Sequence, residues 1–217
     1  MEKFTRLTAI AAPLIRPNID TDAIIPSREM KTVAKTGLAD GLFANWRYSD
    51  VDARIENPDF VLNRPVLRGA PILLAGANFG CGSSREHAVW ALHEYGVRVI
   101  IAPSFGAIFQ GNCVRNGLLP IVLPEAVVVA LAARGEADPT AGALTIDLVE
   151  QVVIDADGAR QAFVLPPADR MMLLEGLDAV GLTLKRMDVI RAFEAGHRLA
   201  RPWLFAHPDH TLLGSKT

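Results

Sequence analysis

Residues 72–92, ILLAGANFGCGSSREHAVWAL, contain the pattern that decides the fold. The stretch begins in an apolar run, and we expect a buried strand over residues 65–75. A turn rich in glycine and serine follows the run. Beyond the turn, an amphipathic pattern predicts a helix over residues 84–95, with Gly96 placed to end it. A strand, a tight turn and a helix in direct succession are typical of α/β proteins.

The same pattern recurs in the residues that follow. Residues 97–102, VRVIIA, predict a second buried strand, and residues 118–123, LLPIVL, predict a third. Between them, residues 104–117 begin with serine and end with glycine, which predicts a helix. Strands that alternate with helices over short connections predict a right-handed α/β arrangement with a sheet that is at least partly parallel.

Two segments before this core pattern have a different character. The first 25 residues predict extended segments around a turn at residues 17–18. Residues 27–50 are irregular and predict a short helix followed by a long loop. Long loops in compact domains are often functional, so we expect this one to take part in a site.

Two further patterns fill the C-terminal part of the chain. Residues 143–165 alternate apolar and polar positions around Asp157-Gly158, which predicts a β-hairpin. From residue 166 to about residue 196 the pattern is helical. We therefore expect a main domain over residues 1–165 and a helical extension over residues 166–217 that packs on this domain or on a partner.

The composition is that of an ordinary globular protein. The chain has 217 residues, of which 50% are hydrophobic, and a net charge of −2, with no basic stripe that would indicate nucleic acid binding. Its apolar runs are far shorter than a membrane span. Pro13 and Arg16 interrupt an apolar start that faintly resembles a signal peptide, so we expect a cytoplasmic protein. Two cysteines are too few for a disulfide scaffold or for the thiolates of an iron–sulfur cluster.

The turn combines several groups that bind anions. Gly80 and Gly82 allow positive φ and the close approach of a ligand. The spacing from Ser83 to Glu86 fits a capping box, and the free N–H groups of such a helix start favour an anion. Arg85 adds a forked cation that can hold a carboxylate at two points. The turn therefore predicts a site for a small carboxylic acid, with a plain capped helix as the structural alternative.

Three other kinds of site agree less well with the same stretch. GANFGCG lacks the G-x-G-x-x-G spacing of dinucleotide-binding folds. Neither serine of the turn lies in the G-x-S-x-G pattern of hydrolases. Cys81 as a nucleophile lacks an identifiable base that would activate it.

Five segments together resemble one protein family. They occur in order and cover most of the chain: NIDTDAIIPS (18–27), LFANWRY (42–48), ILLAGANFGCGSSREHAVWAL (72–92), APSFGAIFQGNCVRNGLLPI (102–121) and GLDAVGLTLKRMDVI (176–190). All five are similar to the small subunits of bacterial 3-isopropylmalate dehydratases. The central GCGSSREHA resembles the signature of the swivelling domain of the aconitase superfamily.

The resemblance implies a fold, an activity and a partner. The fold is an α/β structure of the β/β/α swivelling type with a C-terminal helical tail. The activity is the isomerisation of 2-isopropylmalate and 3-isopropylmalate by dehydration and rehydration, in leucine biosynthesis. In this family the [4Fe-4S] cluster is held by a separate large subunit. We therefore expect no metal or cofactor on this chain and a large iron–sulfur subunit as its partner.

The resemblance also assigns roles by motif position. Ser83 would be the base that removes the carbon-bound proton, and Ser84 and Arg85 would bind a substrate carboxylate. Thr21 and Asp22 match the family's Thr-Asp pair and would position the substrate or its neighbours. Without the family, the same pair fits an Asx-type turn.

The loop over residues 27–48 is expected to select the side group of the substrate, because an isopropyl group needs an apolar pocket. The candidates for lining that pocket are Leu38, Leu42, Phe43 and Trp46. Lys35 is a further candidate for substrate binding, and Lys35 or Arg28 could supply the additional cation that a tricarboxylate needs. An apolar pocket discriminates by only ~1–3 kcal/mol. The same chemistry on citraconate, methylmalate, dimethylmalate or homoaconitate therefore stays open, as does a non-catalytic module that binds a small acid.

The remaining clusters are expected to be structural. His87 and His93 lie six residues apart in one predicted helix, and Cys113 is expected to be a small core residue. HPDH at residues 207–210 has no further ligands and is not expected to bind a metal. One apolar stripe is expected to pack within the tail or to form an intersubunit contact, and it comprises Met171, Leu174, Leu177, Met187, Ile190 and Phe193.

Overall fold

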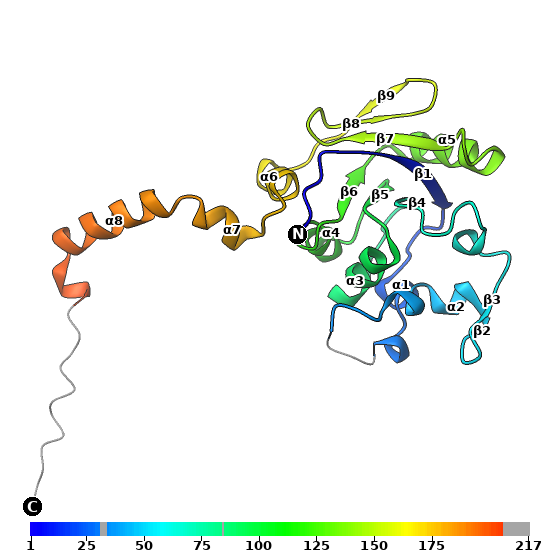
Figure 1. The fold of residues 1–217 in the computed structure, drawn as a ribbon, viewed down its shortest axis with the longest axis horizontal. Helices are drawn as coiled ribbons and strands as arrows, with labels where there is room; N and C mark the ends of the chain where they lie inside the picture. The colour runs from blue at the N-terminus through cyan, green and yellow to red at the C-terminus, as the bar shows by residue number, and fades with distance from the viewer. Residues whose placement is uncertain (31–33, 84, 206–217) are drawn as a thin grey trace, which may run out of the picture. The chain divides into compact units, whose positions relative to one another are not determined.

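The computed structural model describes residues 1–30, 34–83 and 85–205 of the chain. Within these residues, one sheet has the strand order β6-β5-β4-β1-β7-β8-β9 (Figure 1). Its parallel part comprises β1 (Arg6–Leu14), β4 (Ile72–Ala75), β5 (Val99–Ala102) and β6 (Leu119–Val122). Its antiparallel part comprises β7 (Ala143–Asp147), β8 (Val152–Ile154) and β9 (Arg160–Ala162). The prediction of an α/β fold with a partly parallel sheet is confirmed.

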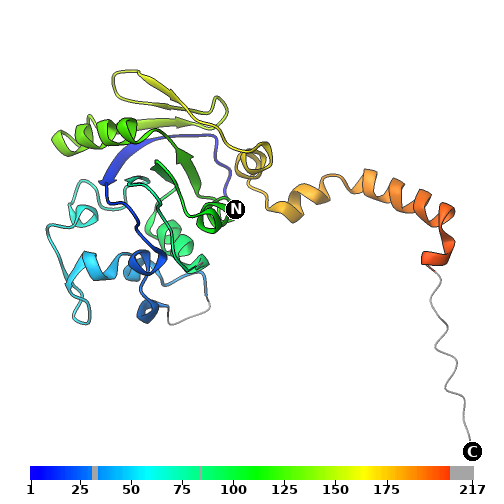
Figure 2. The ribbon, with the colours of Figure 1, turned by 180° about the vertical axis from the view of Figure 1, so that it is seen from behind.

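Helices cover both faces of the parallel part. Following β4 and β5, α3 (Glu86–Tyr95) and α4 (Ala107–Arg115) pack against each other, and Figure 2 shows them from behind. On the sheet, α5 (Glu125–Ala137) contacts β1, β4 and β5. Because strand side chains alternate between faces, Leu73 and Ile100 join the core cluster that α3 and α4 share, while Ile72 and Ile101 are buried outside it. Ile72 and Ile101 therefore lie on the opposite face of the sheet from α3 and α4, and we assign the cover of that face to α5.

A long segment between β1 and β4 carries short elements. They are α1 (Thr21–Ile24), α2 (Ala44–Arg47), β2 (Tyr48–Asp50), β3 (Ile55–Glu56) and the 3-10 helices η1 (Ser27–Glu29), η2 (Ala39–Gly41) and η3 (Val61–Asn63). The turn expected at residues 17–18 is present, with Asn18 at φ 56°. The extended structure expected through residue 25 ends earlier, because Asp20 caps α1 by accepting a hydrogen bond from the Ala23 N–H at 2.7 Å.

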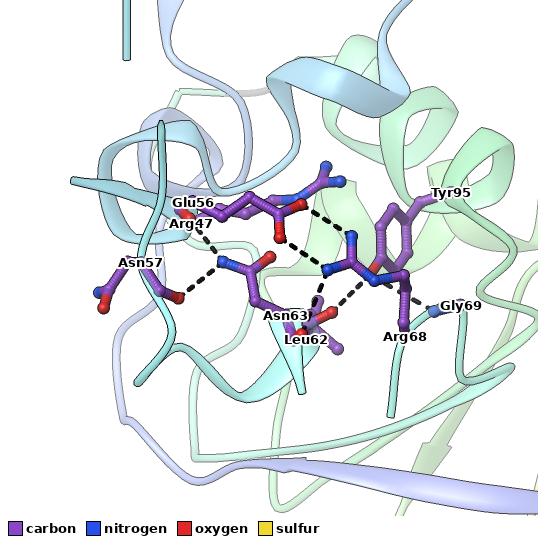
Figure 3. Close-up of polar contacts among 8 residues, drawn as sticks. All are labelled: Arg47, Glu56, Asn57, Leu62, Asn63, Arg68, Gly69 and Tyr95. Carbon is purple, nitrogen blue, oxygen red and sulfur yellow. Dashed lines mark hydrogen bonds and ion pairs between the residues drawn. The ribbon is translucent and has the colours of Figure 1, made fainter. Parts of the chain in front are cut away.

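Polar contacts hold the second half of this segment together (Figure 3). Asn63 Nδ2 donates to the carbonyls of Arg47 and Asn57 at 2.6 and 2.8 Å. Arg68 pairs with both carboxylate oxygens of Glu56 at 2.7 Å, and this guanidinium holds the pKa of Glu56 below its ordinary value. The hairpin β2–β3 and η3 are thereby tied to each other through side-chain hydrogen bonds.

Several predicted boundaries move by a few residues. The strand expected from residue 65 begins only at Ile72, because residues 61–63 form η3 and turns follow it. The helix expected from residue 104 begins at Ala107, since Ser104 instead bonds the preceding turn. The hairpin around Asp157-Gly158 is confirmed as β8–β9, with Gly158 at φ 84°.

The chain divides into two compact units, Met1–Asp178 and Ala179–Thr217. The first unit extends past residue 165 and includes α6 (Pro167–Glu175), which buries Met172 and Leu173 and leaves Met171 exposed. The buried positions of α6 are therefore Met172 and Leu173, and of the expected stripe Met171 is exposed while Leu174 and Leu177 are half-buried. In the second unit, the described elements are α7 (Ala179–Leu184), α8 (Met187–Ala200) and η4 (Pro202–Leu204). HPDH at residues 207–210 lies outside the described residues.

Candidate active site

The glycine–serine turn lies where the parallel strands end. Residues 76–83 follow β4, and the turn's Phe79 pairs with Phe105, which follows β5. Ser104 fixes the turn from the β5 side, since its hydroxyl accepts from the Asn78 N–H at 2.8 Å and its carbonyl from the Phe79 N–H at 3.1 Å. Ligands of open α/β sheets bind at the carboxyl ends of the strands, and this turn occupies that edge.

Two glycines give the turn its shape. Gly80 and Gly82 have φ values of 71° and 85°, which is the left-handed region expected from the sequence. A Cβ on Gly80 would lie 2.1 Å from the Phe109 ring of α4. The turn is therefore packed directly against α4, and no side chain fits between them.

The segment that follows β1 pairs with the turn and brings Thr21 to it. The Gly80 N–H donates to the Ile19 carbonyl at 2.7 Å, and the Thr21 N–H donates to the Cys81 carbonyl at 3.1 Å. The Thr21 hydroxyl donates to the Ser83 carbonyl at 2.5 Å, and Thr21 is only 1% exposed. Thr21 thus fixes the backbone of Ser83, and Ser83 itself is exposed.

The capping box expected from Ser83 and Glu86 is wrong. Helix α3 starts at Glu86, its N-cap residue is Arg85, and no side chain caps it. Glu86 instead accepts a hydrogen bond from Asn116 Nδ2 at 2.8 Å, which ties the first turn of α3 to the end of α4. Ser83 therefore lies in the turn before the helix, and Ser84 lies outside the described residues.

Arg85 pairs with Asp22 of α1, a contact that the sequence did not predict. Arg85 Nη1 donates to Asp22 Oδ1 at 2.5 Å and to Ser27 Oγ at 2.7 Å. The Arg85 side chain is 25% exposed, so part of it is reachable from solvent. Ser83, Arg85, Thr21 and Asp22 thus form one cluster at the edge of the sheet. Sequence reasoning missed Ser27, because nothing local marks a residue that bonds a partner 58 positions away.

The structure does not bring the proposed specificity residues to this cluster. Leu38, Leu42 and Phe43 are buried in the core, so they have no surface to offer a substrate in this conformation. Trp46 stacks on Phe43 with 5.7 Å between ring centroids, and the Arg16 guanidinium lies 4.9 Å from the Trp46 ring. Lys35 Nζ lies 5.2 Å from the Trp90 ring of α3.

A carboxylate on α3 anchors residues 37–39, in the middle of the loop over residues 27–48. Glu94 accepts hydrogen bonds from the N–H groups of Gly37, Leu38 and Ala39 at 2.7, 2.6 and 3.0 Å. Burial raises the pKa of Glu94 and these three donors lower it, and the net shift is downward. This anchor was not predicted, because a lone glutamate on a helix carries no signal of a distant loop.

The cysteines do not suit an iron–sulfur cluster. Cys113 is fully buried on α4, and this burial raises the pKa of its thiol well above the ordinary value. Cys81 in the turn is half-buried, and with only two cysteines in the sequence no set of three or four thiolates exists in this chain. Across the described residues, no group of three His, Cys, Asp or Glu side chains could hold a metal ion.

No helix of the described part is both long and apolar enough to span a bilayer.

The two histidines of α3 are packed against neighbouring side chains. The His87 ring contacts Trp90 at 4.8 Å between centroids, and burial together with Arg98 holds the pKa of His93 below its ordinary value. Neither histidine contacts Ser83 or Arg85 through any hydrogen bond seen in the described residues.

Two family models match the chain. The model of the aconitase C-terminal domain matches residues 1–126. The model of the C-terminal domain of the 3-isopropylmalate dehydratase small subunit matches residues 180–207. The 3-isopropylmalate dehydratase small subunit of Cupriavidus necator is 60% identical, and the match covers 94% of this chain and 98% of that protein. The same protein of Methylibium petroleiphilum is 52% identical, over 94% of this chain and 97% of that protein.

Solved structures agree with the sequence comparisons. The crystal structure of a 3-isopropylmalate dehydratase from Methanocaldococcus jannaschii superposes with a TM-score of 0.60 at 26% identity, and the match covers 87% of this chain and 99% of that one. The fold, both family models and the curated relatives point the same way. The chain belongs to the family of 3-isopropylmalate dehydratase small subunits, whose main domain is the aconitase C-terminal domain.

Proposed function

We propose that this chain and a large iron–sulfur subunit together interconvert 2-isopropylmalate and 3-isopropylmalate in leucine biosynthesis. The observation that supports it best is the cluster that Ser83 and Arg85, at the glycine–serine turn, form with Thr21 and Asp22 of α1. At the edge of a sheet, a serine can remove a proton from a small hydroxy acid and an arginine can bind one of its carboxylates. A dehydration also needs a group that activates the leaving hydroxyl, and the proposed partner supplies it.

Ser83 is the proposed base for the carbon-bound proton. A serine hydroxyl becomes basic enough only where its negative charge is stabilised and water is excluded. In this chain Ser83 is exposed, so a partner must cover it. The iron–sulfur cluster of the large subunit would act as a Lewis acid on the leaving hydroxyl and on one carboxylate of the substrate.

Arg85 and Ser84 are the proposed holders of a substrate carboxylate. The guanidinium is fixed by Asp22, and part of the Arg85 side chain is still reachable from solvent. Thr21 acts on the site indirectly, because its hydroxyl holds the Ser83 carbonyl and so sets where the Ser83 side chain can point. A bidentate arginine–carboxylate contact would orient the substrate relative to Ser83.

The large subunit is the proposed partner, and the cytoplasm is the proposed location. The C-terminal unit is a candidate for part of the contact. Phe193 of α8 and Trp203 of η4 are 69% and 67% exposed, and solvent-exposed apolar side chains on an amphipathic helix gain from burial against another surface. Residues 180–207 match a model of the small-subunit family, whereas the aconitase domain model ends at residue 126.

Replacing Ser83 by alanine tests the proposal. The expected result is loss of 3-isopropylmalate turnover by at least about 1,000-fold while the large subunit is still recovered with the chain, because Ser83 is exposed and supports no packing. Ser49→Ala on the hairpin β2–β3 is the matched control and should leave turnover unchanged. Near-normal turnover by Ser83→Ala would sink the assignment of the base.

The substrate is tested in the same assay. Citraconate and homoaconitate are offered to the assembled enzyme beside 3-isopropylmalate. Turnover of 3-isopropylmalate in preference to both supports the proposed substrate. Turnover of one of the other acids alone would keep the chemistry and replace the substrate.

A further inference from the structure

The hydrogen bonds of Arg85 all leave from one nitrogen. Nη1 donates to Asp22 Oδ1 at 2.5 Å and to Ser27 Oγ at 2.7 Å. Because Nη1 carries two hydrogens, these two acceptors use both of them. Nε and Nη2 have no hydrogen-bond partner among residues 1–30, 34–83 and 85–205, and they carry three further hydrogens.

This arrangement leaves one way to grip a carboxylate. A guanidinium binds both oxygens of a carboxylate either through Nη1 and Nη2 or through Nε and Nη2. The first edge needs Nη1, which Asp22 and Ser27 occupy. The second edge has no partner among the described residues, and it is the edge that does not include Nη1.

Ser27 adds an orientation that Asp22 alone does not define. If Asp22 Oδ1 were the single acceptor, the guanidinium could rotate about that one hydrogen bond. The second acceptor on the same nitrogen, Ser27 Oγ, removes this freedom. The Ser27 hydroxyl lies 3.4 Å from Asp22 Oδ1, so it can accept from Arg85 and direct its own hydrogen toward Asp22. The three groups then support each other in a closed triangle.

The backbone that carries Ser27 is itself held. The Met30 N–H donates to the Ser27 carbonyl at 3.1 Å and closes η1. Glu29 in the same turn pairs with Arg54 Nη2 at 2.6 Å, and the Glu29 side chain is only 8% exposed. Ser27 is therefore presented from an anchored turn, which is what a residue that positions another needs.

We propose that Ser27 is a positioning residue of the substrate site. It fixes Arg85 so that the Nε/Nη2 edge receives the substrate carboxylate. The inference rests on the proposed function, because it concerns the orientation of Arg85 in the proposed substrate site. Ser27 itself touches no reacting atom.

The test compares Ser27→Ala and Ser27→Thr in the enzyme assembled with its large subunit. We expect Ser27→Ala to raise KM for 3-isopropylmalate about tenfold, the worth of one hydrogen bond to a charged group, with kcat within about twofold of the parent. Ser27→Thr keeps the hydroxyl and should restore KM. The inhibition constant of 2-isopropylsuccinate, a dicarboxylate without the leaving hydroxyl, should rise with KM and recover with it.

The possible outcomes separate this inference from the proposed function. An active parent enzyme with an unchanged KM in Ser27→Ala overturns the inference alone. A parallel loss of kcat and melting temperature in both variants also overturns it, because that pattern belongs to a purely structural residue. A parent complex without any 3-isopropylmalate turnover contradicts the proposed function, and the inference fails with it.

Discussion

Gly80 joins the shape of the turn to the packing of α4. Its φ is positive, and the Phe109 ring occupies the place where a Cβ would be. Gly158, in the β8–β9 turn, has a similar φ of 84° but nothing within 4 Å of a Cβ. A Cβ at Gly158 would therefore cause backbone strain alone, whereas a Cβ at Gly80 would cause backbone strain and overlap with Phe109.

Alanine at each of these glycines gives the first prediction. Gly158→Ala should lower the free energy of unfolding by ~1 kcal/mol, the cost of a left-handed backbone for a residue with a Cβ. Gly80→Ala adds overpacking against Phe109 and should cost ~3 kcal/mol. Urea unfolding of both variants measures the difference. Equal losses would mean that the turn and α4 are not packed as described.

His93 provides a prediction about pH. Its folded pKa lies below the ordinary value because of burial first and the Arg98 charge second. The unfolded chain therefore binds more protons between the two pKa values, and the stabilising effect of the neutral ring is complete above about pH 6.5 and lost as the pH falls below it. His93→Gln should reduce the change in unfolding free energy between pH 7.5 and pH 5. A variant with the parent's pH dependence would rule out a depressed pKa.

At the scale of elements, Glu94 links α3 to the start of η2. Three backbone N–H groups converge on one carboxylate, and no other acceptor for them lies in the described residues. Losing the charge weakens all three contacts, while part of the effect is screened because the residue is exposed.

Glu94→Gln should therefore cost ~1 kcal/mol of stability near pH 7. Since the folded pKa of Glu94 is depressed, this difference should be present above its ordinary value near 4.5 and should shrink as the pH falls through the folded pKa. Glu136→Gln on the exposed side of α5 is the control. Unfolding curves at pH 7 and pH 3.5 measure both variants, and a constant difference across this range would contradict the anchor.

Elements could be anticipated from the sequence better than contacts. The strands β5 and β6 and the helix α4 between them follow from apolar runs and a glycine stop, because these signals act over a few residues. The predicted capping box was wrong, because the Glu86 carboxylate accepts a hydrogen bond from Asn116 at the end of a different helix, α4. A site with Ser83 and Arg85 could be predicted from the turn itself, whereas Thr21 and Asp22 were added to it only through the family motif. The contacts of Ser27 and Glu94 could not be anticipated, since they join segments 58 and 55 to 57 positions apart.

At the scale of the whole molecule, the chain has a self-contained first unit. Met1–Asp178 includes all seven strands of the sheet together with α3, α4 and α5. The described helices α7 and α8 bury no residue. Removing residues 179–217 should leave a folded protein with a melting temperature within a few degrees of the parent, because little apolar surface is lost from the core. Circular dichroism melts of both proteins measure this. A truncated chain that fails to fold cooperatively would show that the second unit belongs to the core.

Anaerobic reconstitution tests the central claim, that this chain is half of a dehydratase, most directly. The chain is used as bait in extracts of its source cells, the captured iron–sulfur protein is purified, and turnover of 3-isopropylmalate is measured for each component and for both together. We predict no turnover by either one and turnover by the pair, since the proposed base Ser83 and the proposed carboxylate holder Arg85 lie on this chain and the proposed iron–sulfur cluster on its partner. A pair that is inactive on 3-isopropylmalate, or a chain that is active alone, would contradict the account.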